Sequence, residues 1–476
     1  MKIAERRLLL RFPTALVVAA AWACLVGIST QSLAGEKRFG QQVIEILRDE
    51  GKIDDERYRE LRELEEAEHE SAEGPDSPDP TEFAVSYKNA LNLTRNDGQV
   101  KIKIGGRIQA DFASIHVDSD LRNSTVKSKP EDDARIGGDG EGVELRRTRI
   151  YLSGDLYNRI VFKSQFDFAG GGVSLKDQYL GMKNLPYVGT ILVGHMKEPF
   201  SLEQLTSSKY LTFMERSLSS VFDKGRNFGV LFKNHYVEKR LTASAGIFAV
   251  TSSDVEFSSR DRDFNLTGRV TGLPYYDARA KQLVHLGFSA SHRFSENGTT
   301  ALAQGPEIHQ APDFLEIAEF TTDGSTTIAA ELAAVAGPFA LQAEWKNGWF
   351  DNRDEENWEG SGAYVEASYF LTGESRSYNT AAGVFGRVSP IRPLDFDAGD
   401  CGAWQIALRY SWIDLQDGST NGGEEQNITA ALSWHLYSNV RMQFNYTFAD
   451  VNDSGTELSH ASGHIHAFHT RAQLEF

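Results

Sequence analysis

The stretch AWQIALRYSW at residues 403–412, followed by NITAALSWHLY at 427–437 and VRMQFNYTFAD at 440–450, decides the fold. In the first segment every second residue is apolar, and the residues between are mostly polar: Trp404, Ile406, Leu408, Tyr410 and Trp412 alternate with Gln405, Ala407, Arg409 and Ser411. Side chains of a β-strand point alternately to opposite faces of the sheet. Each segment therefore predicts a strand with one apolar and one polar face. Strands of about ten residues with this alternation are typical of membrane β-barrels.

The same alternation continues over most of the chain from residue 82 onward. It predicts about sixteen strands, approximately at 100–112, 143–155, 159–168, 174–182, 190–197, 227–235, 241–251, 264–273, 283–294, 326–336, 339–349, 362–371, 403–414, 427–437, 440–450 and 467–476. A soluble β-sandwich also alternates, but rarely with so many strands in series. Backbone polar groups in lipid have no water partner, so the sheet must close on itself. The sequence predicts an all-β, transmembrane antiparallel β-barrel. Segment 372–402 is long where a short turn is expected, which leaves the register around it open.

The composition excludes several other classes of protein. The chain has 476 residues, of which 40% are hydrophobic and 24% charged, with a mean hydropathy of −0.39. A helical membrane protein needs apolar runs of roughly 20 residues, and none follows the first 30 positions. The net charge of −18 argues against general nucleic-acid binding. Of the two cysteines, Cys24 lies in the predicted export signal, so no internal disulfide is expected.

Residues 1–34 read as a signal peptide for export. A basic start is followed by the apolar run Phe12 to Ile28, and Ser32-Leu33-Ala34 offers small residues for cleavage after Ala34. The alternatives are an uncleaved membrane anchor and a lipoprotein site at Cys24. Cleavage after Ala34 fits better. Export through a cleaved signal peptide, together with the predicted barrel, implies the bacterial outer membrane as the location.

The region before the barrel divides into two parts. Residues 35–70 are acidic and predict a short N-terminal helical periplasmic segment, with Gly51 ending one helix and Asp54 capping the next. This segment is either a solvated helical hairpin or an element for oligomerisation or tethering. Residues 71–81 form a Pro-rich linker, and 82–476 form the outer-membrane β-barrel.

If apolar positions face lipid, the opposite parity faces the lumen. The basic side chains placed inside by this rule are Lys101, Lys103, Arg107, Arg147, Arg149, Arg159, Lys163, Lys233, Arg269, Arg293, Lys346, Arg409, Arg441 and Arg471. The acidic side chains placed inside are half as many: Asp111, Asp155, Asp167, Glu331, Glu344, Glu366 and Glu475. Rings of Arg and Lys favour anions and phosphate in pores. The alternative is that the lumen charges pair with one another and keep the wall wet.

The segment 198–226 is too long for a simple hairpin loop and combines an apolar set of residues with several bases. We expect it to fold into the lumen and narrow it, because long loops in compact folds are usually functional; packing on a neighbouring subunit is the alternative. With the lumen positions it supplies the candidate anion-binding residues, which are Lys103, Arg107, Arg147, Arg149, Lys163, Lys209, Arg216, Arg226 and Arg409.

Several long blocks resemble the phosphate-selective porin O and P family. These are GGRIQADF at 105–112, ELRRTRIYLSGDL at 144–156, FDFAGGGVSLKDQYL at 166–180 and VGHMKEPFSLEQLTSSKYLTFMERS at 193–217, with GRNFGVLF, GAYVEASYFLTGESR and GAWQIALRYSWIDL further on. The resemblance runs in order through nearly all of 100–476. It implies a sixteen-stranded trimeric barrel with loops folded inward and a basic ladder leading to a phosphate site.

Other chemistry is sparse in the sequence. His460, His464, His466 and His469 cluster before the last strand, but a solvated loop is favoured over a metal site, and no cofactor or metal is expected. Ser433 and His435 share the inner face of a strand without an evident third catalytic partner, so an enzyme such as an outer-membrane hydrolase is the less favoured alternative. The favoured function is a passive porin for small anions, with phosphate or related oxyanions as the favoured permeant species. A general, weakly selective porin is the second hypothesis. The expected partners are these anions, outer-membrane lipid and two further copies in a homotrimer, and no nucleic acid.

Overall fold

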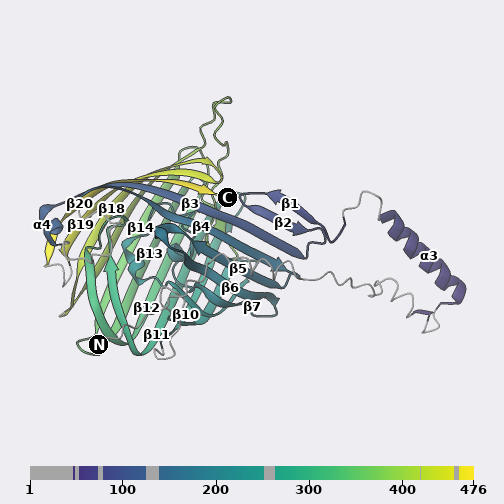
Figure 1. Cartoon of the computed structure of the whole chain (residues 1–476), viewed down its shortest axis with the longest axis horizontal. Coiled ribbons are helices and arrows are strands. Elements are labelled where there is room, and N and C mark those ends of the chain that lie inside the picture. The colour runs from purple at the N-terminus through teal and green to yellow at the C-terminus, as the bar shows by residue number, and fades with distance from the viewer. Residues whose placement is uncertain are drawn as a thin grey trace, which may run out of the picture. The chain divides into compact units, whose positions relative to one another are not determined.

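The computed structural model describes residues 47–48, 53–72, 79–124, 139–250, 263–418, 420–454 and 460–476 (Figure 1). The chain divides into two compact units, Met1–Asp79 and Pro80–Phe476. The predicted signal peptide, most of the first predicted helix and most of the Pro-rich linker lie outside the described residues.

In the first unit the long described element is helix α3, Asp55–Ala72. The Oδ1 atom of Asp54 accepts a hydrogen bond from the backbone N–H of Arg57 at 2.8 Å, which confirms the predicted N-terminal cap. No helix among the described residues is long and apolar enough to cross a membrane.

The second unit is a closed β-barrel (Figure 1). Its sixteen strands are β3 (Val100–Val117), β4 (Gly140–Leu156), β5 (Ile160–Asp167), β6 (Ser174–Leu185), β7 (Gly189–Lys197), β8 (Arg226–Tyr236), β9 (Leu241–Ala249), β10 (Phe264–Asp277), β11 (Gln282–Gln304), β12 (Leu315–Ala336), β13 (Phe339–Asn352), β14 (Trp358–Phe370), β17 (Ala403–Asp417), β18 (Thr420–Tyr437), β19 (Val440–Ser454) and β20 (Ala461–Glu475). Each pairs antiparallel with its neighbour, and β20 pairs with β3 from Ile465↔Val117 to Glu475↔Arg107. The predicted strand number and closure are confirmed.

The two faces of the wall follow the predicted alternation. On β17, Leu408 on the outer face is 56% exposed, whereas the neighbouring Arg409 on the inner face is 2% exposed. A shift of register by one residue would reverse both, so burial of the inner face specifies the pairing.

The barrel closes where the C-terminus meets two glycines. The backbone N–H of Gly106 donates to the carbonyl oxygen of Phe476 at 2.5 Å, and the Phe476 N–H donates back to Gly106 at 3.3 Å. A Cβ atom on Gly105 would lie 2.6 Å from the Phe476 carbonyl oxygen and from the Tyr151 hydroxyl. The pair Gly105-Gly106 therefore lets the last residue complete the ladder.

A β-hairpin precedes the barrel. Strands β1 (Phe83–Tyr87) and β2 (Leu91–Arg95) pair with each other, and β2 pairs with the start of β3, from Leu91↔Ile104 to Thr94↔Lys101. This hairpin extends the sheet beyond the end of β20.

Two segments fold into the barrel from opposite ends. Residues 198–225 connect β7 to β8 and contain helix α5 (Leu202–Leu205) and the 3-10 helix η3 (Leu218–Phe222). The backbone carbonyls of Leu211 and Met214 in this loop accept hydrogen bonds from inward-facing arginines of β19 and β20. The expectation that the loop folds into the lumen is confirmed.

The second inserted segment is residues 371–402, which connects β14 to β17 on the side of the short turns. Short turns mark the periplasmic side of such barrels. The segment contains the hairpin β15 (Tyr378–Asn379) and β16 (Val384–Phe385), and Phe385 is buried against Leu202 and Leu283. Strands β14 and β17 remain direct neighbours, so the long connection leaves the register intact.

The inner face is not polar throughout. At the end away from the short turns, Ile115, Ile413, Val451 and Ile465 point inward and pack with Phe314 and other side chains in a buried apolar cluster. We expected apolar strand positions to face lipid and the positions between them to face the lumen. This expectation is wrong over this part of the barrel, because loop residues fill the interior and bury the inward-facing apolar side chains. The open space is left on the side of β3 to β10.

Candidate functional site

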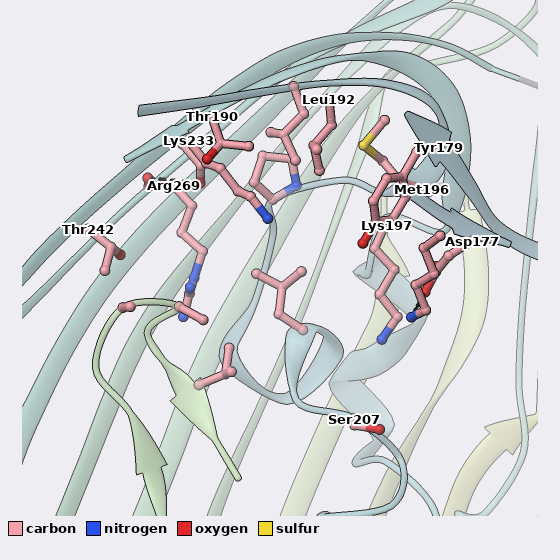
Figure 2. A pocket seen from close by; sticks show the side chains of 18 of the residues that line it. Asp177, Tyr179, Thr190, Leu192, Met196, Lys197, Ser207, Lys233, Thr242 and Arg269 are labelled. Carbon is pink, nitrogen blue, oxygen red and sulfur yellow. Dashed lines mark hydrogen bonds and ion pairs between the residues drawn. The ribbon is translucent and has the colours of Figure 1, made fainter. Parts of the chain in front are cut away.

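A cavity of about 780 Å³ lies inside the barrel, between the wall of β3 to β10, the 198–225 loop and the 371–402 segment (Figure 2). Among the residues that the structure describes, nine basic side chains and a single carboxylate, that of Asp177, line it. The basic residues are Arg107, Arg147, Arg149, Lys163, Lys197, Arg216, Arg226, Lys233 and Arg269. This is a strongly cationic cavity in a chain whose net charge is −18.

Six of the nine candidate residues meet at this cavity, namely Arg107, Arg147, Arg149, Lys163, Arg216 and Arg226. The other three, Lys103, Lys209 and Arg409, do not line it. Strand parity brought the four wall residues together, and the inserted loop and its return to β8 supply Arg216 and Arg226.

Arg107 faces the tip of the inserted loop. Its Nη1 atom donates to the Oγ of Ser208 at 2.7 Å and lies 3.5 Å from the Oγ of Ser207. No carboxylate among the described residues pairs with Arg107. Hydroxyl groups hold the guanidinium group of Arg107 in place without neutralising its positive charge.

Asp177 on β6 neutralises part of the cationic wall. Its Oδ2 atom lies 2.5 Å from Lys163 Nζ, and its Oδ1 atom lies 2.6 Å from Arg226 Nε. One carboxylate thus serves two cations from β5 and β8, and the group keeps a formal charge of +1.

Two more cavity arginines pair with acids that do not line it. Arg149 Nε lies 2.6 Å from Asp167 Oδ2, and Arg147 Nη2 lies 3.4 Å from Glu215 Oε2. The carboxylate of Glu215, in the loop, also accepts hydrogen bonds from Arg146 and Arg471. Burial raises the pKa of Glu215, but the surrounding arginines outweigh this effect and hold the pKa well below its ordinary value.

Three further cations reach the cavity without a carboxylate partner among the described residues. Lys197 Nζ donates to the carbonyl oxygen of Gln204. Arg216 donates to the carbonyl oxygens of Glu203, Gln204 and Thr206 at 3.2–3.3 Å, close to the end of α5. Lys233 has neither an ion pair nor a hydrogen bond within the described part of the chain.

The remaining candidates are held in other contacts. Arg409 is paired with Glu307 and lies 3.5 Å from Glu203 Oε1, all three being buried. Lys209 Nζ lies 3.0 Å from Glu475 Oε2. Lys103 is exposed near the start of β3. The inference that these three contact the permeant ion at a common site is therefore not supported by their placement.

Sequence reasoning did not select Lys197, Lys233, Arg269, Ser208 or Asp177 as site residues. Parity placed Lys233 and Arg269 inside, which was an available signal. The same signal was available for Asp177. Leu180 and Met182 on β6 face outward, so the alternation of side chains places Asp177 on the inner face. Lys197 follows the inward-facing Met196, so parity would place Lys197 outside; β7 ends there and the chain turns into the lumen.

The other chemical groups do not assemble into a centre. His460 contacts Asp453, His464 contacts Asp118 and His469 is buried near Thr447. Within the described ranges no three His, Cys, Asp or Glu side chains are arranged to hold a metal ion. Ser433 and His435 both face inward on β18, and no hydrogen bond joins them among the described residues.

Comparison with known proteins identifies relatives of this barrel. Residues 102–476 match the family described as phosphate-selective porin O and P. An uncharacterized protein of Caulobacter vibrioides is 28% identical over 390 residues, covering 78% of this chain and 72% of the relative. Porin O of Pseudomonas aeruginosa is 23% identical over 372 residues, covering 71% and 78% respectively. The solved anion-selective porin from Comamonas acidovorans superposes with a TM-score of 0.48 at 12% identity, covering 79% of this chain and 100% of that one.

Proposed function

As a member of the phosphate-selective porin O and P family, this chain is a β-barrel channel of the bacterial outer membrane, and we propose that it passes small anions, with phosphate or a related oxyanion as the permeant species. Family and fold both point to a channel rather than an enzyme. The observation that carries the proposal is that, in the described part of the chain, nine basic side chains and one acidic side chain line the cavity.

The local charge decides the selectivity because distant charges are screened. Surface charges lose most of their effect beyond a Debye length of about 8–10 Å in physiological salt. Acidic residues in loops and turns therefore contribute little potential inside the lumen. Arg107, Lys197, Arg216 and Lys233, which have no carboxylate partner among the described residues, attract an anion, and the planar guanidinium group of arginine matches the oxygens of phosphate.

A general, weakly selective porin is the competing function. The pairs of Arg149 with Asp167, of Arg226 with Asp177 and of Arg269 with Glu331 favour it, because paired charges keep a wall wet without selecting an ion. The two functions differ in the sign and size of the reversal potential across a salt gradient.

The test is a planar bilayer recording across a potassium chloride gradient, followed by addition of phosphate. We expect an anion-selective reversal potential and a phosphate-dependent decrease of the chloride current. Arg107→Gln should weaken both. Arg279→Gln, which removes an exposed arginine from a turn outside the cavity, is the matched control and should change neither. Cation selectivity of the unmodified channel would contradict the proposal.

The assembly and processing of the chain are also proposals. We expect a homotrimer whose mature chain begins near Gly35, with residues 35–70 in the periplasm. N-terminal sequencing of the purified protein and its mass in detergent by light scattering test both points. A monomer in detergent, or a retained N-terminus, would contradict them.

A further inference from the structure

We propose that the cationic cavity binds amphiphilic organic anions, meaning a carboxylate, sulfonate or phosphate monoester attached to an apolar body. This inference rests on the proposed anion pathway and names a substrate class for it. The argument comes from the part of the cavity lining that carries no charge.

One wall of the cavity is apolar. Leu192 and Met196 on β7 and Leu231 on β8 line the cavity and pack with Phe248 on β9 in a single apolar cluster. Leu192 and Leu231 are directly opposite each other in the strand register. Figure 2 shows Leu192 and Met196 on the strand wall, with Lys197 and Asp177 on one side in this view and Lys233 and Arg269 on the other.

Glycines on the inner face make room for this cluster. A Cβ atom on Gly229 would lie 2.5 Å from Phe248 Cδ1, and one on Gly246 would lie 2.7 Å from Phe248 Cε2. The Phe248 ring therefore occupies the space where both side chains would stand. The inner face of β8 and β9 is therefore apolar at this point, whereas the rest of the cavity wall carries charged and polar side chains.

The inserted segments add apolar surface to the same cavity. Leu205 comes from the 198–225 loop, and Ala381, Ala382 and Val384 come from the 371–402 segment. All four keep part of their surface exposed. The cavity is thus lined by aliphatic side chains from the barrel wall and from both inserted segments.

An inorganic ion gains nothing from such a surface, because aliphatic groups cannot replace its hydration shell. An organic anion gains twice. Its charged head can pair with Arg107, Lys197 or Arg216, and its apolar body leaves water against the aliphatic wall. The volume of about 780 Å³ lies within the roughly 300–1,000 Å³ typical of sites for small organic molecules.

The experiment compares three solutes as blockers of the chloride current in planar bilayers. Acetate and benzoate carry the same charge and differ in the apolar body, and benzamide is the uncharged counterpart of benzoate. We expect benzoate to block at about tenfold lower concentration than acetate, since the ring adds buried apolar area. Benzamide should block much more weakly than benzoate.

The variant pair separates the apolar wall from the charge. Leu192→Ala combined with Leu231→Ala should bring the half-blocking concentration of benzoate close to that of acetate, with acetate unchanged. The control is Leu286→Ala, which removes a leucine that is 50% exposed on the outer face and should leave both blockers unchanged. If the double variant does not insert, Val384→Ser tests the same surface from outside the barrel strands.

The outcomes distinguish the two proposals. An anion-selective channel that benzoate and acetate block equally overturns the amphiphilic class and leaves the anion pathway standing. Equal block by benzamide and benzoate also overturns it, because the charge would then play no part. A cation-selective channel refutes the anion pathway, and the amphiphilic class with it.

Discussion

Arg226 Nε lies 2.6 Å from Asp177 Oδ1, so the first residue of β8 is tied to the first part of β6 across the intervening strand β7. The same carboxylate also forms an ion pair with Lys163 of β5. Asp177 therefore links the strands that carry the cationic wall and lowers the positive potential that a permeant anion meets.

Replacing Asp177 by asparagine should strengthen anion binding. Asp177→Asn leaves Lys163 and Arg226 without their carboxylate, and phosphate block of the chloride current should tighten by about three- to tenfold. Asp155→Asn is the matched control, because it frees Lys183 outside the cavity. Unchanged block in Asp177→Asn would mean that this carboxylate does not face the ion path.

Arg409 should act on stability and not on selectivity. Its removal in Arg409→Gln leaves the buried Glu203 and Glu307 unpaired, which costs about 3–5 kcal/mol for a broken buried ion pair. We expect a clear fall in the temperature at which the barrel loses its compact form on unboiled gels. Arg107→Gln, at a site without a carboxylate partner among the described residues, should alter phosphate block with little thermal effect. If Arg409→Gln changed phosphate block without lowering the unfolding temperature, and Arg107→Gln did the opposite, the assignment of stability to Arg409 and of anion binding to Arg107 would be contradicted.

The contacts of Arg216 should hold the inserted loop in place. Arg216→Ala removes hydrogen bonds to three backbone carbonyls of residues 203–206, and these carbonyls then lack their donor. We expect noisier and larger single-channel conductance together with weaker phosphate block. Arg216→Lys should restore part of both properties, because a lysine keeps the charge. A conductance and block identical to the unmodified channel would show that the loop does not limit the path.

Glu203 predicts a pH-dependent stability. Burial raises its pKa to about 7, against the opposing attraction of Arg409 and Lys346. In the unfolded chain the group ionises near 4.5, so its stabilising contribution is complete below pH 4.5 and is lost as the pH rises through about 7. The difference corresponds to at most about 3 kcal/mol.

This pH dependence can be measured as the unfolding temperature of the barrel at pH 5 and pH 8. The unmodified protein should be more stable at the lower pH through this group. Glu203→Gln keeps the size of the side chain and should reduce the difference between the two values. An unchanged difference would show that another group is responsible.

Much of the barrel could be predicted because its signal is local. The alternation at 427–437 depends only on neighbouring residues, and it matches the second part of β18, which begins at Thr420 and ends at Tyr437. Strand ends were less accurate, as for the strand predicted at 326–336, because β12 extends back to Leu315 where the lipid-facing alternation has stopped. Parity then placed Arg107, Arg147, Arg149 and Lys163 inside, and the structure places all four at one cavity.

The pairing of charges could not be predicted in this way. Arg409 and Arg107 are both inward-facing arginines of barrel strands, yet Arg409 meets Glu307, 102 residues away in the chain, and Arg107 meets Ser208. Which inward arginine is neutralised depends on the loop that reaches it. Periodicity also placed no constraint on the 371–402 segment, whose hairpin enters the barrel and places Val384 at the cavity.

The amino-acid sequence by itself determined the strands, the alternation of their side chains between two faces and the need to close the sheet, because these follow from a period of two and from unsatisfied backbone groups in lipid. Tertiary structure alone decided where the lumen stays open. The two inserted segments and the apolar cluster around Ile413 and Phe314 fill part of the interior, and the cavity with its basic lining lies along β3 to β10. Burial of apolar side chains and long-range ion pairs set that division, and neither is visible in the alternation along a strand.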